Sequence, residues 1–276
     1  MKTEEPKVKC PECGGSGLKL IRMPVQEYIQ RNGLVNIYGK ENWDMDVGIK
    51  CPLCNGGMDI RVQQAKSSAN IPETFYDKRL TDFDWNYVDD SGNAVDLTKH
   101  KGVVESFVKD YEKWDDKGLG LYIYSECKGS GKTFLASCIC NELMATKAMR
   151  TRFVNASDLI KISQSGEYWS NDMYKKDPLL LLYNCKFLVI DDLGQKNCGG
   201  EWIEDLLYTL LNDRINNKKV TVITSNVKIN QLPFDERITD RINSMCVPLH
   251  LPEVRRRGKD AQRVKHDFMK EIGLVI

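Results

Sequence analysis

Histidine is scarce in this sequence, which contains only three: His100, His250 and His266. None of them has an obvious partner, so nothing resembles a Ser/His/Asp or Cys/His catalytic triad. Low-complexity segments are missing too, and the only internal repeat is a pair of short cysteine motifs. The sequence therefore gives no sign of covalent catalysis by serine or cysteine.

A long apolar run and a strong net charge are also missing. The most apolar stretch, residues 179–190, is interrupted by Asn184 and Lys186 and is too short and too polar to span a bilayer. Residues 1–6 have no apolar segment of the kind found in signal peptides. We therefore expect a cytoplasmic protein without membrane contact. The formal net charge is +1, so a surface for nucleic acid would need local clustering of charge.

The sequence has ten cysteines, which without a secretory signal suggest a reducing compartment and thiols that bind metal or are simply buried. Four of them form two near-identical C-P-x-C-x-G motifs, one with Cys10 and Cys13 and one with Cys51 and Cys54. Two thiolates on each tight turn suit a closed, tetrahedral Zn²⁺ site with no open position for catalysis. We expect a structural zinc; the alternatives are a redox C-x-x-C pair or a chance pairing.

A phosphate-binding loop is the central motif of the chain. Residues 119–124 are apolar and aromatic, as in a strand, and they lead through a Gly-Ser-Gly turn directly into a helix-like segment. The glycines let backbone N–H groups curl around phosphate oxygens, and the helix N-terminus adds partial positive charge. Lys132 would reach the β- and γ-phosphates, and the Thr133 hydroxyl would hold Mg²⁺. The expected nucleotide-binding residues of this loop are Cys127, Lys128, Gly129, Ser130, Gly131, Lys132 and Thr133.

One residue departs from the pattern G-x-x-x-x-G-K-[ST]. Glu126 stands where the pattern has its first glycine. A carboxylate beside a triphosphate is unfavourable unless the side chain points away. We expect the Glu126 side chain to turn outward if a subunit interface completes the site.

An apolar run at residues 187–190 ends in two carboxylates, Asp191 and Asp192. Such an uninterrupted run suits the central strand of a parallel sheet that is covered on both faces. The carboxyl end of this strand would meet the Mg²⁺ held by the phosphate-binding loop. We expect Asp191 to orient the metal shell and Asp192 to position or deprotonate the attacking water. Alternatively, Asp192 is a capping or turn carboxylate.

A second strand, residues 220–225, delivers Asn226 to the same edge, where it would hold the water or sense the γ-phosphate, unless it is an ordinary turn residue.

Arg237 and Arg241 then lie four apart, on one helix face, and Arg255–Arg257 follow a final strand-like run. Phosphoryl transfer benefits from an arginine beside the γ-phosphate, supplied in cis or by a neighbouring subunit. The alternative is that these arginines are solvated surface charges.

Residues 167–176 combine aromatic and basic side chains, including Tyr168, Trp169, Tyr174, Lys175 and Lys176. Aromatic rings stack on bases and lysines contact the phosphate backbone, so this composition suits single-stranded DNA. A plain surface loop is the alternative.

The order of these motifs resembles an AAA+ ATPase core. The segments Ile71–Phe75, Asp191–Gly194, Asn212–Arg214 and Thr224–Asn226 are similar to the DnaC/DnaI/IstB-like helicase-loader family. The resemblance covers residues 60–257 and extends more loosely to the cysteine-rich N-terminus. It implies an α/β fold, a P-loop three-layer sandwich with a parallel five-stranded sheet, plus a small N-terminal zinc-binding domain with four cysteine ligands.

The resemblance also divides the chain and assigns roles. Residues 1–60 would be a zinc-binding, helicase-interaction domain, residues 61–100 a connector that packs on the core, and residues 101–276 the AAA+ ATPase domain. Its site residues would then be Lys132 and Thr133 as Walker A, Asp191 and Asp192 as Walker B, Asn226 as sensor 1, Arg237 or Arg241 as the arginine finger, and Arg255 or Arg256 as a sensor 2-like residue.

The function implied by this family is ATP-dependent loading of a hexameric replicative DNA helicase onto single-stranded DNA at replication initiation. ATP or ADP, Mg²⁺ and Zn²⁺ would be the cofactors, and the chain would self-assemble through its ATPase site. Two alternatives stay open. One is an IstB-like ATPase that assists a transposase, and the other is a zinc-module scaffold with a weak P-loop.

Overall fold

The computed structural model describes residues 12, 18–31, 43–51, 58–89, 91–164, 178–194, 201–256, 265–266 and 268–272. The chain forms two compact units, Met1–Gln64 and Ala65–Ile276. Helix α2 (Met58–Ala69) is continuous across this division, so the expected boundary at residue 60 falls inside a helix. Within the described ranges, every helix is too short or too polar to serve as a membrane span.

The first unit contains a two-stranded antiparallel ribbon. Strand β1 (Leu18–Pro24) pairs with β2 (Asp44–Lys50), with Leu18 opposite Lys50 and Pro24 opposite Asp44. Helix α1 (Val25–Arg31) follows β1 at once. Met23, Val25 and Ile29 are buried and form a small apolar core for this unit.

The second unit is built on a five-stranded parallel sheet. Its strands are β5 (Gly120–Tyr124), β6 (Thr151–Asn155), β7 (Phe187–Leu193), β8 (Thr221–Ser225) and β9 (Cys246–His250), in the order β6-β7-β8-β5-β9. All four neighbouring pairs run parallel, so the carboxyl ends of all strands meet at one edge. The predicted α/β fold with a parallel five-stranded sheet is therefore confirmed.

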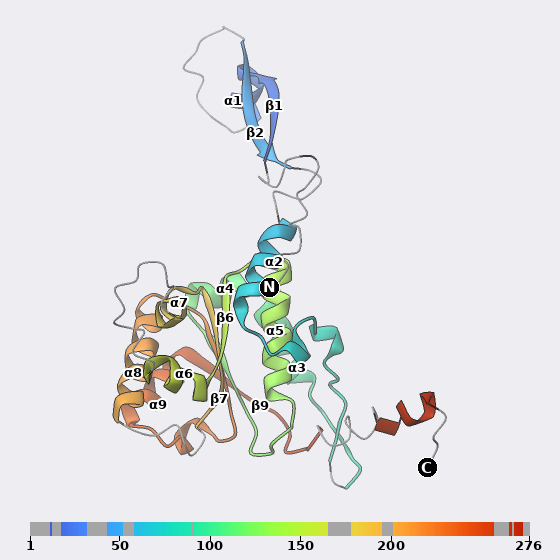
Figure 1. Ribbon diagram of the computed structural model, residues 1–276, viewed down its shortest axis with the longest axis vertical. Coiled ribbons are helices and arrows are strands. Elements are labelled where there is room, and N and C mark those ends of the chain that lie inside the picture. The colour runs from blue at the N-terminus through green and yellow to red at the C-terminus, as the bar shows by residue number, and fades with distance from the viewer. Residues whose placement is uncertain are drawn as a thin grey trace, which may run out of the picture. The chain divides into compact units, whose positions relative to one another are not determined.

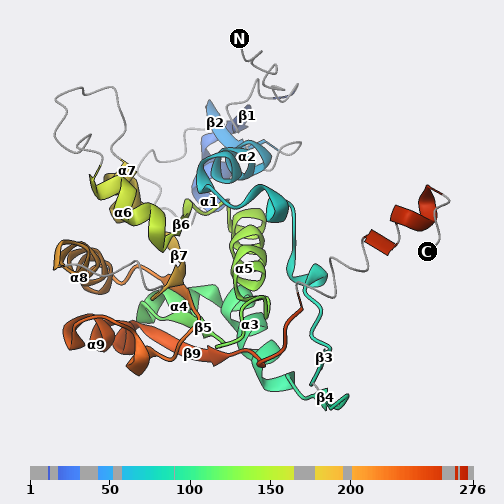
Figure 2. The same ribbon diagram turned by 60° about the horizontal axis from the view of Figure 1, so that its bottom comes forward.

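Helices cover both faces of this sheet, as Figures 1 and 2 show. Helices α3 (Thr98–Lys109), α4 (Tyr111–Lys117) and α5 (Lys132–Lys147) share one apolar core. Helices α6 (Ala156–Gln164), α7 (Pro178–Asn184), α8 (Glu201–Asn216) and α9 (Glu236–Met245) share the other. The strands alternate between the two: Leu121 and Ile123 of β5 face the first core, and Tyr122 faces the second. This explains why the strands are apolar throughout.

The segment before β5 packs on helix α5. It contains two short 3-10 helices, η1 (Glu73–Phe75) and η2 (Leu80–Asp82), and a small hairpin of β3 (Tyr87–Val88) and β4 (Ala94–Val95). The centroid of the Phe134 ring lies 5.2 Å from the centroid of the Phe75 ring and 5.8 Å from that of the Phe83 ring. Arg79 donates two hydrogen bonds to the Glu142 carboxylate, at 2.7 and 2.6 Å. This segment is therefore an integral part of the second unit.

Arg214 of α8 is fully buried and contacts the residues that precede β7 and β8. Its guanidinium donates to the backbone oxygens of Leu182, Cys185 and Val220 at 3.1, 3.1 and 2.7 Å, and to the Thr221 hydroxyl at 2.8 Å. Burial lowers the pKa of this guanidinium. The same guanidinium lies 3.6 Å from Cys185 Sγ. The arginine thus ties the end of α7 to the residues that begin β7 and β8, and no carboxylate of the described residues forms an ion pair with it.

Candidate functional site

The phosphate-binding loop joins β5 to α5 at the carboxyl edge of the sheet. Gly129 and Gly131 have φ angles of 83° and 105°, in the left-handed region that favours glycine. A Cβ atom on Gly131 would also lie 3.2 Å from the Tyr87 hydroxyl. That hydroxyl donates to the backbone oxygen of Ser130 at 2.6 Å. The Gly-Ser-Gly turn is thus required both by its backbone and by its contacts.

Lys132 begins helix α5 and is 7% exposed. Its Nζ donates to the backbone oxygens of Ser125 and Cys127, at 2.9 and 3.0 Å, and to the Ser130 hydroxyl at 3.2 Å. Burial lowers the pKa of the ammonium, and the carboxylates of Asp192 and Glu253 partly offset this effect. The lysine is therefore held inside its own loop, where a bound phosphate would lie.

Thr133 and Asp191 lie within hydrogen-bonding distance at the foot of this loop. The Thr133 hydroxyl donates to Asp191 Oδ2 at 3.2 Å, and the Thr224 hydroxyl donates to Asp191 Oδ1 at 2.6 Å. Asp191 is 6% exposed, and burial raises the pKa of its carboxyl while the two hydroxyls partly offset the rise. A hydroxyl and a buried carboxylate are hard oxygen donors of the kind that Mg²⁺ prefers. These two residues fit the expected cation.

A bulge in β7 brings both carboxylates to the sheet edge. Ile190 is paired with Ile223 and Leu193 with Ser225, so Asp191 and Asp192 together face one residue of β8. Asp192 has a left-handed φ of 60°. Its N–H donates to the Thr224 hydroxyl at 2.8 Å. Thr224 therefore stabilises the bulge. The only sequence signal for this role was its place in the segment Thr224–Asn226.

Asn226 lies beside the second carboxylate, as its position after β8 suggested. Its Nδ2 donates to Asp192 Oδ1 at 2.6 Å. The structure thus brings together Lys132, Thr133, Asp191, Asp192 and Asn226, which are the residues expected to carry the chemistry.

The two arginines of α9 are held differently. Arg241 stacks on the Tyr208 ring, with 3.9 Å from Cζ to the ring centroid, and its Nη2 donates to the Tyr208 hydroxyl at 2.7 Å. Arg237 has a side chain that is 65% exposed and pairs with Asp235 at 2.9 Å. Among the described residues, neither guanidinium forms an ion pair or hydrogen bond with the loop at residues 125–133.

The arginines after β9 also diverge. Arg255 is exposed, whereas Arg256 is turned toward the segment before β5. The backbone N–H of Arg256 donates to the backbone oxygen of Gly129 at 3.0 Å. The Arg256 guanidinium forms an ion pair with Asp84 at 2.9 Å and lies 4.7 Å from the centre of the Tyr87 ring. Arg256 thus holds the phosphate-binding loop in place. Arg257 lies outside the described residues.

Most residues of the expected zinc site lie outside the described ranges, namely Cys10, Cys13 and Cys54. Cys51 is described and is fully buried. Among the residues that the structure describes, no group of three or more His, Cys, Asp or Glu side chains is placed to hold a metal ion. The aromatic and basic residues 168–176, expected to contact DNA, are also outside the described ranges.

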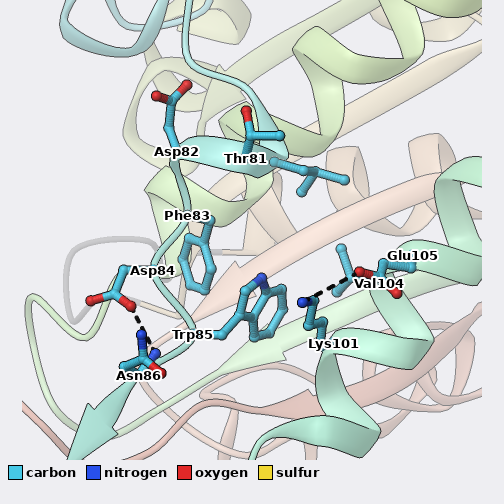
Figure 3. A pocket seen from close by; sticks show the side chains of 10 residues that line it. Thr81, Asp82, Phe83, Asp84, Trp85, Asn86, Lys101, Val104 and Glu105 are labelled. Atoms are coloured by element: carbon cyan, nitrogen blue, oxygen red, sulfur yellow. Dashed lines mark hydrogen bonds and ion pairs between the residues drawn. The ribbon is translucent and has the colours of Figure 1, made fainter.

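A cleft of about 530 Å³ lies between η2 and α3 (Figure 3). Its polar lining is mainly acidic, with Asp82, Asp84 and Glu105, and its one lysine, Lys101, is 3.8 Å from Glu105. Phe83 lines the cleft and also lies 3.4 Å from the Cβ position of Gly131. The excess of carboxylates makes this cleft unsuited to phosphate.

Known proteins similar to this chain include two replicative helicase loaders. No protein-family model matches the chain. The replicative helicase loader DnaI of Bacillus subtilis (strain 168) is 25% identical over 211 residues, which are 71% of this chain and 65% of DnaI. The replicative helicase loader DnaC of Escherichia coli (strain K12) is 27% identical over 184 residues, which are 63% of this chain and 70% of DnaC. The chain thus spans less than two thirds of the length of DnaI.

Solved structures show the same fold. A crystal structure of DnaI has a TM-score of 0.53 and 26% identity, covering 67% of this chain and 96% of that one. The DnaC helicase loader has a TM-score of 0.53 and 22% identity, covering 66% and 100%. AMPPCP-bound DnaA from Aquifex aeolicus has a TM-score of 0.50 and 17% identity, covering 75% and 58%. The predicted resemblance is confirmed: the DnaI and DnaC replicative helicase loaders are homologues of this chain, and its structural neighbours include DnaI, DnaC and DnaA.

Proposed function

We propose that this protein binds and hydrolyses ATP and uses the nucleotide to load a replicative DNA helicase onto single-stranded DNA. The observation that carries the proposal is the convergence of Lys132, Thr133, Asp191, Asp192 and Asn226 at one edge of the sheet. These are the groups that phosphoryl transfer to water requires: a cation for the phosphates, oxygen donors for Mg²⁺ and polar groups for the attacking water. The similarity to helicase loaders is the reason for proposing a replicative helicase as the partner protein.

Each residue has a chemical task in this proposal. The backbone N–H groups of residues 129–133 and the Lys132 ammonium bind the phosphates. The Thr133 hydroxyl and Asp191 hold Mg²⁺, which would neutralise charge on the transferred phosphoryl group. Asp192 accepts a proton from the attacking water or orients it, and Asn226 fixes the Asp192 carboxylate by the hydrogen bond at 2.6 Å.

The arginine finger is assigned to Arg237 and comes from a neighbouring copy of the chain. Arg241 is engaged by Tyr208 and Asn212 within its own protomer, with an Nη2 to Asn212 Oδ1 distance of 3.2 Å. Arg237 is exposed, and its partner Asp235 lies only two residues away, in a pair that solvent screens. A neighbour's phosphate would compete for this guanidinium more easily than for that of Arg241. Arg255, also exposed, is assigned to the nucleotide phosphates in cis.

The N-terminal unit is assigned to zinc and to the helicase. Cys51, a buried thiol beside the end of β2, has the low exposure expected of a ligand in a closed metal site. Cys10, Cys13 and Cys54 would complete the set of four thiolate ligands. A DNA contact is assigned to residues 168–176, on their aromatic and basic composition.

Two measurements on the full chain test this proposal. The first is Mg²⁺-dependent ATPase activity of the natural sequence and of Lys132→Ala. Activity in the natural sequence and background activity in the variant are expected; equal background rates in both would instead support a scaffold with a weak P-loop. The second is recovery of a purified hexameric replicative helicase by the immobilised full chain. A parallel measurement offers a purified transposase to the immobilised chain; capture of the transposase and not of the helicase would favour the IstB-like alternative.

A further inference from the structure

Glu253 lies just beyond the last strand, β9, and its carboxylate binds the beginning of the phosphate-binding loop. Oε1 accepts the Glu126 N–H at 3.0 Å. Oε2 accepts the Ser125 hydroxyl at 3.0 Å and also the Cys127 N–H. The two carboxylate oxygens thus join residues that lie more than half the domain apart in the sequence.

His250 holds this carboxylate from the other side. Its Nε2 lies 2.8 Å from Glu253 Oε1. Its ring stacks on Tyr124, the residue opposite it in the sheet, with ring centroids 4.8 Å apart and planes inclined at 25°. Burial tends to raise the pKa of Glu253, but the hydrogen bonds from His250, two N–H groups and Ser125 outweigh it and leave the pKa below its usual value. Glu253 is therefore an ionised carboxylate in a fixed position.

The place of this contact explains how the loop accommodates a glutamate where P-loops have glycine. Glu126 is absent from the described residues with positive φ, so its backbone does not need glycine's freedom. Glu126 is exposed. The N–H groups of Glu126 and Cys127 point at Glu253, which anchors the start of the loop just before the residues that would bind phosphate.

We propose that Glu253 is a positioning residue of the nucleotide site, which fixes the start of the phosphate-binding loop so that the N–H groups of residues 129–133 are preorganised for phosphate. This inference rests on the nucleotide binding proposed above. Preorganised donors bind more tightly because the loop loses little freedom when the ligand arrives. Glu253 itself touches no phosphate, and its effect passes through the backbone of residues 125–127.

The test compares Glu253→Ala and Glu253→Gln in the full chain, with Glu73→Ala, an exposed glutamate on η1, as the matched control. Calorimetry measures the affinity for AMPPCP with Mg²⁺, and hydrogen exchange of the nucleotide-free protein measures protection of the peptide that covers residues 121–131. Loss of charge-assisted hydrogen bonds should weaken AMPPCP binding by about tenfold in Glu253→Ala and by about threefold in Glu253→Gln, which keeps one acceptor oxygen. Exchange in this peptide should become faster in the same order.

Several outcomes are distinguishable. If the natural sequence does not bind AMPPCP, the proposed nucleotide function fails, yet the exchange experiment still tests the positioning role on its own. If binding occurs and is lost in Lys132→Ala, but both Glu253 variants keep the affinity and exchange of the natural sequence, the inference about Glu253 is overturned. Should Glu253→Ala fail to fold, the comparison of Glu253→Gln with Glu73→Ala decides.

Discussion

The Thr224 hydroxyl donates to Asp191 Oδ1 at 2.6 Å, and the oxygen of the same hydroxyl accepts the N–H of Asp192 at 2.8 Å. One buried threonine thus fixes the side chain of one carboxylate and the backbone of the next. Its position is set by β8, so the sheet itself determines where the two carboxylates lie.

Thr224→Val should impair hydrolysis far more than binding. Valine has the shape of threonine but neither donates to Asp191 nor accepts from Asp192, so the bulge loses both hydrogen bonds. Because small displacements of catalytic groups are costly, the ATPase rate should fall by about 10- to 100-fold. Affinity for ATP should change by less than about threefold, since Lys132 and the loop are untouched. Thr224→Ser keeps the hydroxyl and serves as control. If Thr224→Val hydrolysed ATP as fast as the natural sequence, the proposed role of the Thr224 hydroxyl in placing the two carboxylates would be contradicted.

Asp191→Asn should stabilise the nucleotide-free protein while weakening Mg²⁺-dependent binding. Burial raises the pKa of Asp191, so the folded state favours the protonated carboxyl. Once the pH exceeds the pKa that this carboxyl has in the unfolded chain, its negative charge destabilises the folded state. A neutral asparagine removes this cost, and a gain of about 1 kcal/mol would raise Tm by about 2–4 °C at neutral pH. The gain should shrink as the pH falls toward the unfolded pKa. Thermal unfolding at several pH values tests this; a lower Tm at pH 7 would argue against it.

Arg237→Ala should abolish the activity that depends on assembly. If the guanidinium acts on a neighbour's phosphate, its loss should lower the ATPase rate on the order of a thousandfold and leave ATP affinity nearly unchanged. Mixing Arg237→Ala with Lys132→Ala should restore part of the activity, because each variant supplies the half that the other lacks. Arg241→Ala should instead lower thermal stability, since Arg241 packs on Tyr208. No recovery in the mixture, with assembly intact, would exclude a trans role.

Arg214→Leu should be strongly destabilising. The guanidinium is fully buried and satisfies the backbone oxygens of Leu182, Cys185 and Val220. Leucine would leave these acceptors unsatisfied, at a cost of about 3 kcal/mol or more. Urea unfolding monitored by tryptophan fluorescence measures the loss, with the exposed Arg255→Leu as control. Equal stability of the two variants would show that water or repacking replaces the arginine.

Zinc content offers a fifth test. One Zn²⁺ per chain is expected by elemental analysis of the full chain, because the four cysteines proposed as ligands would form a closed site. Cys51→Ser should remove the metal and lower recovery of the helicase, while the buried Cys246→Ser should leave the metal bound. A full zinc complement in Cys51→Ser would exclude this cysteine as a ligand.

The strands and their polar ends could be predicted from the sequence because buried parallel strands are continuous apolar runs, and 187–190 is one of them. The bulge at Asp191 and Asp192 could not, because nothing in the run of residues 187–193 marks which position is unpaired. Glu253 was missed for another reason. Its partners are distant in the sequence, and a lone glutamate after a strand has no local pattern.

The hydroxyl of Tyr87 holds Ser130, and Arg256 lies against the same tyrosine ring. A fragment that begins at residue 101, where the expected ATPase domain starts, would lack Tyr87, Phe83 and Asp84. It would keep every side chain proposed to act in catalysis but lose the residues that pack against the phosphate-binding loop. A fragment that keeps the whole second unit would begin no later than Ala65, which is already buried in its core.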